Sequence, residues 1–297
     1  IMINIIQRRI QKTLSKLTQK EPQDNGDFAK RIIYRHKVFW SDADAELVRN
    51  SPLYEGITIE QLKSTKHWQR KLSNKYNARV FAQKFGCRVP QLYWKGRDLK
   101  ELSFRNLPDQ YVIRPTIGHS CKMVFLMDKH MNHMDSCFYS DEQLKDVMQE
   151  TLDKNSHQEF LIEEFLRSEK GEYKIPVDYK LSLFNGELAV IDVINRMSPK
   201  TGLSSCYDEN WNMIECIGKQ YQRSAYQAPP ACLPEIINWG KKLSKAYEIF
   251  VRIDFYATDK GAVFGEFTPT PGKGNGFTPE ADIMLLNYWD KFCCGQI

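Results

Sequence analysis

Apolar residues recur at helical spacing through the first third of the chain and at strand spacing in much of the remainder. The segment IEQLKSTKHWQRKLS predicts a helix over residues 59–73, with apolar positions at Ile59, Leu62, Trp68 and Leu72. A second helix is expected to begin after Asn74, whose side chain can cap free backbone N–H groups, and to end at Gly86. We therefore expect residues 1–105 to form a mainly helical N-terminal region.

Residues 106–166 alternate between strand-like and helix-like patterns. Two strands are predicted by the runs YVIRP and KMVFLM, which a small polar loop connects. A helix is expected from Ser140, because Gln143 stands at the position of a capping-box partner, and FLIEEF predicts a further strand. This order indicates a small α/β unit.

Residues 167–297 predict two hairpins and a helix between them. The dipeptide Asn185-Gly186 lies within DYKLSLFNGELAVIDVIN and is a strong hairpin signal. Pro234 stands at the first turn of the predicted helix. The second hairpin joins VRIDFYAT to AVFGEFT, and its strands carry charged residues on an apolar background. Those charges require an explanation.

Composition and charge narrow the class of protein. A chain of 297 residues with 42% hydrophobic content can bury a sizeable core, and no apolar run approaches the roughly 20 residues needed to cross a bilayer. The net charge of +5 is spread along the chain, which argues against nucleic acid as a partner. The eight cysteines form no CxxC pair, so zinc and disulfide scaffolds are not expected. We expect a cytoplasmic protein with reduced thiols.

The last predicted hairpin places charged residues on one face. Arg252 and Asp254 are two apart on one strand, while Glu266 and Thr268 lie on the next. Two carboxylates that face each other repel unless a cation lies between them, and Mg²⁺ usually takes one or two carboxylates together with phosphate oxygens. The alternative is an ordinary salt bridge from Arg252 to Glu266 on a solvated face.

The hairpin ends in EFTPTPGKGNGFTP and resembles the C-terminal signature of ATP-grasp ligases. That signature is R-x-D on one strand and E-x-N-x-x-P-G on the next, and this chain matches it at Arg252, Asp254, Glu266, Pro271 and Gly272. Thr268 replaces the family's asparagine, but it also offers a neutral oxygen. The resemblance implies that Mg²⁺ binds Asp254, Glu266 and Thr268, and that Arg252 stabilises charge on a tetrahedral intermediate.

Two upstream segments are similar to the phosphate-binding parts of the same family. The segment YVIRPTIGHSCKMV carries Arg114 where the family has lysine, and the loop that follows would bind phosphates through Gly118, His119 and Ser120. Arg79 stands in the place of a second phosphate-binding lysine, in a helix that begins Asn74-Lys75. Taken alone, the loop is also compatible with an ordinary hairpin connection.

The segment FLIEEFL resembles the family's adenine-binding hinge strand. The resemblance implies that the backbones of Glu164 and Leu166 bind the base edge and that Glu163 meets the exocyclic amine. An edge strand with paired acids is the alternative.

The segments DYK, FNG, RIDFY and FGEFT resemble the TupA-like branch of ATP-grasp proteins, linked to teichuronopeptide biosynthesis. The resemblance implies that Asp178 binds the ribose hydroxyls, with Glu172 as the alternative. Lys180 and Arg196 would then face the phosphates or an acyl phosphate. It also implies an α+β fold in which two α/β subdomains with antiparallel sheets, residues 106–166 and 167–297, grip ATP.

The activity implied by this resemblance is that of an ATP-dependent carboxylate–amine ligase. With ATP and Mg²⁺, the enzyme would convert a carboxylate to an acyl phosphate, which an amino acid or amino sugar then attacks. The branch implies a uronic-acid-containing glycan or related surface polymer as the acceptor. Two alternatives are a kinase that phosphorylates a hydroxyl group and a nucleotide-binding scaffold without activity.

The first 20 residues predict a basic amphipathic helix. They carry five basic residues and no acidic one, and their apolar residues recur at helical spacing, at Ile3, Ile6, Ile10, Leu14 and Leu17. Such a helix either packs on its own domain or lies on a partner or an anionic membrane surface. A peripheral position at the inner membrane face would bring the enzyme close to a lipid-linked acceptor.

Membrane binding by this segment is testable by co-sedimentation with anionic vesicles. Each basic residue near such a surface contributes about 1 kcal/mol, so we expect the chain to sediment at low salt and to be released as salt screens the charges. The comparison is a chain that lacks residues 1–20, which should stay in solution. Equal sedimentation of the two forms, or unfolding of the shortened one, would contradict the prediction.

Overall fold

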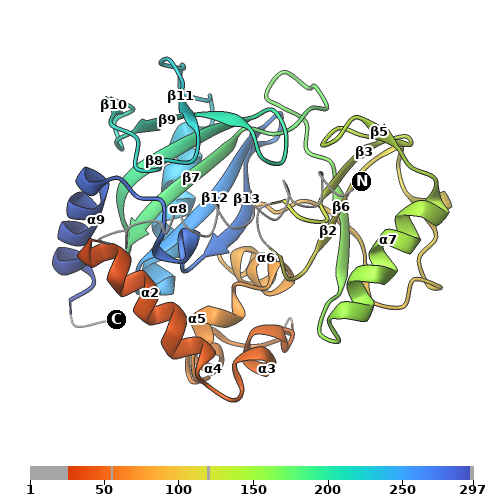
Figure 1. Cartoon of the computed structure of the whole chain (residues 1–297), viewed down its shortest axis with the longest axis horizontal. Coiled ribbons are helices and arrows are strands. Elements are labelled where there is room, and N and C mark those ends of the chain that lie inside the picture. The colour runs from red at the N-terminus through yellow and green to blue at the C-terminus, as the bar shows by residue number, and fades with distance from the viewer. Residues whose placement is uncertain (1–25, 55, 119–120, 295–297) are drawn as a thin grey trace, which may run out of the picture.

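The structure is a computed structural model that describes residues 26–54, 56–118 and 121–294. Figure 1 shows two sheets side by side, a smaller one with α7 (Asp141–Lys154) at the right and a larger one at the left, with the N-terminal helices beneath them. The basic helix expected in the first 20 residues lies outside the described residues.

Before the first strand, the described residues form five helices: α2 (Asp27–Trp40), α3 (Ala45–Asn50), α4 (Ile59–Lys63), α5 (Trp68–Lys71) and α6 (Lys75–Lys84). The single helix expected over residues 59–73 is wrong, because α4 ends at Lys63 and His67 adopts a left-handed conformation before α5. Leu62 and Trp68 are six residues apart, so a continuous helix would turn them to different faces. The break allows both side chains to be buried.

The helix predicted after Asn74 is confirmed as α6. The Asn74 side chain accepts hydrogen bonds from the backbone N–H groups of Tyr76 at 2.9 Å and Asn77 at 3.4 Å. The helix ends at Lys84, and Gly86 then adopts a positive φ of 78° that favours glycine. The cap therefore sets the start of the helix that carries Lys75 and Arg79.

The small sheet has six antiparallel strands in the order β1-β6-β2-β3-β4-β5. Its strands are β1 (Leu92–Gly96), β2 (Gln110–Pro115), β3 (Phe125–Asp128), β4 (Met131–Asn132), β5 (Cys137–Phe138) and β6 (Phe160–Glu164), with a short 3₁₀ helix η1 (Phe104–Asn106) before β2. The expected boundary at residue 106 falls inside this unit, after its first strand.

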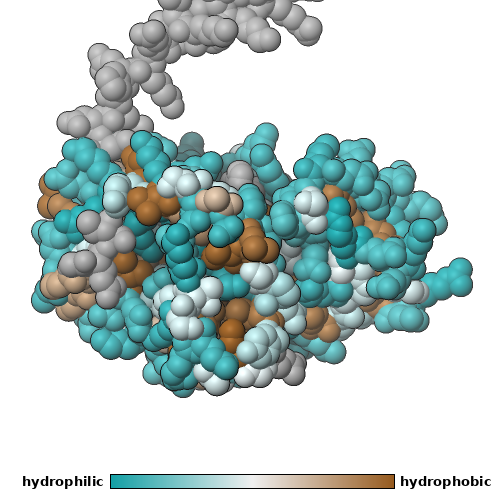
Figure 2. Space-filling model, turned by 90° about the horizontal axis from the view of Figure 1, so that it is seen from below, coloured by the Kyte–Doolittle hydropathy of each residue, from teal (hydrophilic) through white to brown (hydrophobic). Residues whose placement is uncertain are grey.

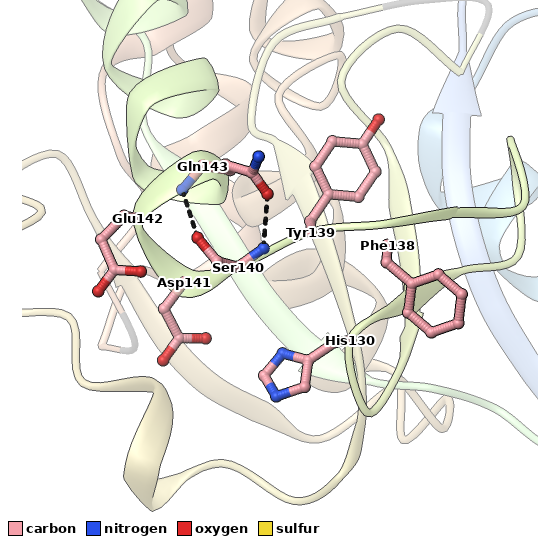
Figure 3. A pocket seen from close by; sticks show the side chains of 7 residues that line it. All are labelled: His130, Phe138, Tyr139, Ser140, Asp141, Glu142 and Gln143. Atoms are coloured by element: carbon pink, nitrogen blue, oxygen red, sulfur yellow. Dashed lines mark hydrogen bonds between the residues drawn. The ribbon is translucent and has the colours of Figure 1, made fainter.

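Helix α7 covers the small sheet and begins where the sequence predicts. Ser140 accepts a hydrogen bond from the Gln143 backbone at 3.2 Å, and the Gln143 side chain accepts one from the Ser140 backbone at 2.8 Å (Figure 3). This is the predicted capping box. Leu144, Met148 and Leu152 lie on one face of the helix and are buried in the core of the small unit.

The large sheet has seven strands in the order β10-β9-β8-β7-β12-β13, and β11 pairs with β9. They are β7 (Asp178–Phe184), β8 (Glu187–Arg196), β9 (Gly202–Tyr207), β10 (Met213–Ile214), β11 (Gln222–Arg223), β12 (Val251–Thr258) and β13 (Gly261–Thr268). Both predicted hairpins are present: β7 joins β8 at Asn185 and Gly186, and β12 joins β13 through residues 259–260. The helix predicted around Pro234 is α8 (Leu233–Tyr247).

The N-terminal helices share one core with the large sheet. Phe28 from α2 packs edge-on against Phe250 and Phe277, with ring centroids 5.2 Å apart in both pairs. Trp289 from α9 (Pro279–Phe292) stacks on Phe250 at 5.7 Å. Between β13 and α9 the chain forms a 3₁₀ turn, η2 (Pro271–Gly274), which contacts α2. Helix α2 therefore belongs to the hydrophobic unit that carries the last hairpin.

The face seen from below in Figure 2 is mostly hydrophilic, and its hydrophobic patches are separated by polar side chains. Within the described part of the chain, every helix is too short or too polar to cross a lipid bilayer.

The contact between α8 and the large sheet depends on Gly240. A Cβ atom at this position would lie 2.6 Å from Leu181 Cδ2 and 3.5 Å from Leu183 Cδ1. We expect Gly240→Ala to lower the free energy of unfolding, because the cost of overpacking, about 1–3 kcal/mol, exceeds the gain in helix propensity of about 1 kcal/mol. Urea denaturation measures the difference. Asn238→Ala on the exposed face of α8 is the control and should be neutral or slightly stabilising; equal stabilisation by both changes would contradict the packing argument.

Candidate active site

Four charged side chains form a row across the large sheet. Strand pairing places Asp192 of β8 opposite Lys180 of β7, Lys180 opposite Asp254 of β12, and Asp254 opposite Glu266 of β13. Residues directly opposite on adjacent strands point to the same face. Along the row the side chains are therefore an acid, a base and two further acids, and these last two are Asp254 and Glu266.

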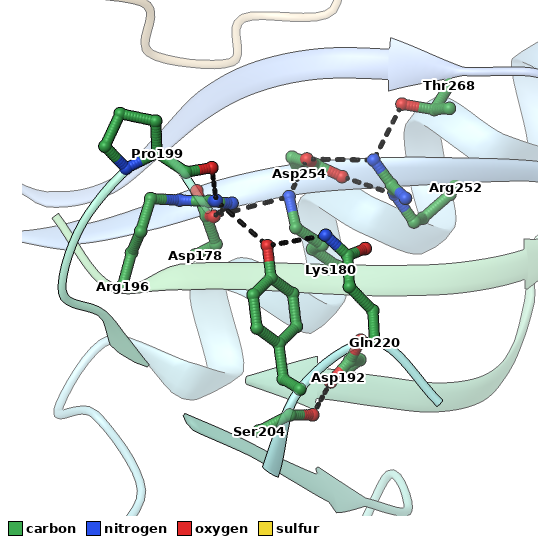
Figure 4. Close-up of polar contacts among 11 residues, drawn as sticks. Asp178, Lys180, Asp192, Arg196, Pro199, Ser204, Gln220, Arg252, Asp254 and Thr268 are labelled. Atoms are coloured by element: carbon green, nitrogen blue, oxygen red, sulfur yellow. Dashed lines mark hydrogen bonds and ion pairs between the residues drawn. The ribbon is translucent and has the colours of Figure 1, made fainter. Parts of the chain in front are cut away.

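Asp254 lies between two cations. Lys180 forms an ion pair with Asp254 and lies 3.5 Å from Asp178, while Arg252 Nε donates to Asp254 Oδ1 at 2.9 Å (Figure 4). Only 2% of Asp254 is exposed. Burial alone would raise the pKa of Asp254, but Arg252 and Lys180 outweigh it and hold that pKa below its usual value. Asp254 is therefore a carboxylate anion.

Asp178 and Arg196 meet beside this group. Arg196 Nη2 donates to Asp178 Oδ2 at 2.7 Å, and its Nη1 donates to the Tyr221 hydroxyl at 3.0 Å (Figure 4). The structure thus brings together Asp178, Lys180 and Arg196, as the sequence predicts. Glu172 pairs instead with Lys174 at an exposed turn.

Glu266 is a partly exposed acid of the row. Its side chain is 34% exposed, and Lys75 Nζ lies 3.4 Å from Glu266 Oε2. Lys75 Nζ also donates to the Gly118 carbonyl at 3.2 Å, so one lysine connects the hairpin to the predicted phosphate loop. Of that loop, His119 and Ser120 lie outside the described residues.

The alternative salt bridge from Arg252 to Glu266 does not form. The guanidinium of Arg252 binds Asp254, and its Nη2 donates to Thr268 Oγ1 at 3.0 Å. The Thr268 hydroxyl, predicted as a metal ligand, therefore accepts a hydrogen bond from Arg252. Its oxygen retains a second lone pair.

The donor set of Asp254 and Glu266 suits Mg²⁺, because two carboxylates stand opposite each other and Mg²⁺ usually completes its shell with water and phosphate oxygens. Within the described ranges, His, Cys, Asp and Glu form no cluster of three or more that could hold a metal by itself. A cation at the two acids would share the space with Lys180, Arg252 and Lys75. The site therefore fits a metal that is bound jointly by protein and nucleotide.

Arg79, Glu163 and Arg114 form a buried ion triad. Arg79 of α6 binds one oxygen of Glu163, and Arg114 of β2 binds the other. Glu163 lies on β6 and is only 2% exposed. The expected roles, arginines on phosphates and Glu163 on the adenine amine, stay predictions. In this structure the three side chains bind one another, and the triad retains one net positive charge.

The hinge strand β6 lies between β1 and β2, so the alternative of an edge strand is wrong. The Glu164 backbone N–H donates to the Gln91 carbonyl at 2.8 Å, and its side chain pairs with Lys260. Leu166 lies two residues beyond the strand, and no backbone partner for it appears among the described residues. Of the two predicted hinge positions, Leu166 is thus the one whose backbone amide can bind a base.

Asp192 is a site residue that sequence reasoning missed. It stands inside the apolar run AVIDVIN, and this isolated charge was the available signal. Ser204 Oγ donates to Asp192 Oδ1 at 2.5 Å. Burial raises the pKa of Asp192 despite this hydrogen bond and the nearby Lys180 and Arg252. Asp192 stands opposite Lys180 on the neighbouring strand, at the β8 end of the row.

Two units with largely antiparallel sheets, and a charged hairpin at the edge of the larger sheet, form the fold of ATP-grasp proteins. A solved structure with this fold is D-alanine–D-alanine ligase from Bacillus anthracis, with a TM-score of 0.50 and 16% identity, over 76% of this chain and 68% of that one. D-alanine–D-alanine ligase from Helicobacter pylori has a TM-score of 0.48 and 16% identity, over 77% of this chain and 61% of that one. The ATP-grasp ligase PsnB in complex with a minimal precursor has a TM-score of 0.43 and 11% identity, over 74% of this chain and 61% of that one.

The family model of TupA-like ATP-grasp proteins matches residues 55–289, which is most of the chain. The chain belongs to this family. Among curated protein sequences, none matches it. The predicted family and fold class, α+β with a helical N-terminal region, are confirmed.

The ion triad generates a prediction about stability. We expect Glu163→Gln to lower the free energy of unfolding by about 3–5 kcal/mol, because it leaves two buried guanidinium groups without their carboxylate. Glu159→Gln, just before the same strand, removes a partly exposed partner of Lys95 and should cost at most about 1 kcal/mol. Chemical denaturation of both variants measures this difference. Similar losses in the free energy of unfolding would show that the buried triad contributes no more than a partly exposed ion pair.

Proposed function

We propose that this chain is an ATP-dependent carboxylate–amine ligase that forms an amide through an acyl phosphate. A carboxylate oxygen of one substrate attacks the γ-phosphorus of ATP and ADP leaves. The amine of the second substrate then attacks the acyl carbon and displaces phosphate. Family membership supports the use of ATP, and the geometry of the last hairpin supports this chemistry.

The observation that carries the proposal is the placement of Arg252. Its guanidinium is held by Asp254 and by Thr268, so its position and direction are fixed before any substrate binds. A fixed cation stabilises negative charge that develops on an acyl oxygen without reorganising during the reaction. A nucleotide-binding scaffold has no use for such a group beside two carboxylates.

ATP would bind between the two sheets. The Leu166 amide is available for the adenine edge, and Asp178 for the ribose hydroxyls. Lys180 and Arg196 point into the same group of side chains from β7 and β8, where they can bind phosphate oxygens (Figure 4). Asp254 and Glu266 would hold Mg²⁺, which neutralises phosphate charge when it is bound. Lys75 approaches from α6 beside the phosphate loop.

The substrates we propose are a uronic-acid carboxylate of a surface glycan and the amine of an amino acid or amino sugar. Membership of the TupA-like family supports this class. Peripheral attachment to the inner membrane face through residues 1–20 remains part of the proposal.

The test removes one metal carboxylate while leaving the fold intact. We expect Glu266→Gln to reduce turnover by at least about a hundredfold, since the loss of fixed charge at a site of phosphoryl transfer typically costs several kcal/mol. Glu266 is partly exposed, so the free energy of unfolding should change little. Release of ADP and phosphate is measured with uronic acids paired with amino acids.

Glu215→Gln is the matched control, because Glu215 is 85% exposed and pairs with Arg223 away from the row. It should retain full turnover. A ligase releases phosphate only when both carboxylate and amine are present, so phosphate retained on the acceptor would identify a kinase. Unchanged ATP consumption by the Glu266 variant would refute the assignment of the metal site.

A further inference from the structure

A second group of cations lies along the seam between α2, α5 and η2. It consists of Arg35, His36, Arg70 and Lys273, and we call it the seam cluster. Burial and then the charges of Arg70 and Lys273 lower the pKa of His36, so both cations act on this residue. Arg70 donates to Thr270 Oγ1 at 3.2 Å and to the Arg35 carbonyl at 2.8 Å. Arg35 donates to the carbonyls of Phe250 at 3.1 Å and Pro269 at 3.4 Å. The two guanidinium groups thus bind only neutral oxygens.

No carboxylate of the described residues lies within ion-pair distance of the seam cluster. The contrast with Arg31 is direct, since this residue lies one turn earlier on α2 and binds Asp290 at 2.6 Å. Arg70 is only 7% exposed, and burial together with the nearby Arg35 lowers its pKa to about 10. The cluster is therefore a concentration of positive charge that the described part of the chain does not neutralise.

Aromatic rings compensate only part of this charge. The guanidinium of Arg70 lies 5.0 Å from the centre of the Phe39 ring, and that of Arg35 lies 5.4 Å from Trp289. Such contacts contribute about 0.5–2 kcal/mol each, whereas removing an ion from water costs several kcal/mol. The rings fix the orientation of the guanidinium groups, and together with the hydrogen bonds to neutral oxygens they leave the positive charge itself without a counter-ion.

His36 adds a second sign of an incomplete site. Its Nδ1 atom is buried and has no hydrogen-bond partner among the described residues. Buried polar atoms in proteins are nearly always satisfied, and an exception needs an explanation such as a ligand or water. A ligand oxygen at this position would satisfy it.

The seam cluster begins close to the catalytic hairpin. Arg252 binds the hydroxyl of Thr268 and Arg70 binds the hydroxyl of Thr270, two residues further along the chain. Lys273 follows in η2 and is exposed, so one cation of the cluster lies at the surface. A Cβ atom at Gly274 would lie 2.7 Å from the Ala29 carbonyl, which shows how closely η2 lies on α2.

We propose that Arg35, Arg70 and Lys273 form a subsite for a phosphate or pyrophosphate group of the acceptor substrate. Three permanent cations match a group with more than one negative charge, and the forked donors of arginine suit phosphate oxygens. The assignment rests on the proposed function, since it names the class of acceptor that the ligase takes: a phosphorylated one, held two residues from the hairpin that performs the chemistry.

The test measures pyrophosphate binding by calorimetry to the full chain saturated with ADP and Mg²⁺, so that the nucleotide site is filled. We expect binding that ADP does not displace. Lys273→Gln should weaken it roughly threefold to tenfold, the effect of losing one charge-assisted contact. Because Lys273 is exposed, this change should leave the fold intact.

The matched control is Lys219→Gln. Lys219 is exposed on a neighbouring segment, where its backbone N–H donates to the Gly276 carbonyl at 2.9 Å, and its loss should leave the affinity unchanged. Equal weakening by both variants would show diffuse attraction and overturn the subsite, as would absence of binding or displacement by ADP. The measurement requires no turnover, so its result is independent of whether the chain proves to be a ligase.

Discussion

The ion triad of Arg79, Glu163 and Arg114 is the interaction on which the relative placement of the parts depends. It joins α6 to two strands of the small sheet, and Arg114 Nη1 also lies 3.5 Å from the Gly265 carbonyl of β13 in the large sheet. A buried charge is tolerated only when it is paired and hydrogen-bonded. The three segments therefore have one mutual arrangement in which the charges are satisfied, and that arrangement fixes the distance between the two sheets.

The same constraint organises the large sheet. Lys180 and Asp254 are buried side by side with the partly buried Arg252, and the carboxylate of Asp254 binds both cations. These ion pairs hold the side chains in fixed directions before a substrate binds. Stabilisation of a charge that develops during the reaction requires such fixed groups. The row of Asp192, Lys180, Asp254 and Glu266 ends at the partly exposed Glu266, so the face is accessible at the edge next to the phosphate loop. Stability and reactivity thus arise from one set of contacts.

Local rules predicted much of this fold. The cap at Asn74, the capping box at Ser140 and the turn at Asn185-Gly186 depend on residues close in sequence, and all three are present. The helix over residues 59–73 failed because burial of Leu62 and Trp68 on one side outweighed helical continuity. The triad at Glu163 could not be predicted, since nothing local specifies which charges separated by 49 and 84 residues will meet.

The order of residues after β13 explains how the charged row and the seam cluster can lie next to each other. Strand β13 delivers Glu266 and Thr268 to the row, and the chain then needs only Pro269 and Thr270 to reach Arg70. Arg70 comes from α5, which packs in the same core as the hairpin, so a rigid helix supplies the cation. A group bound at the seam would be held at a fixed offset from Arg252. Loops alone could not maintain that offset, because ordering them at each encounter costs conformational entropy.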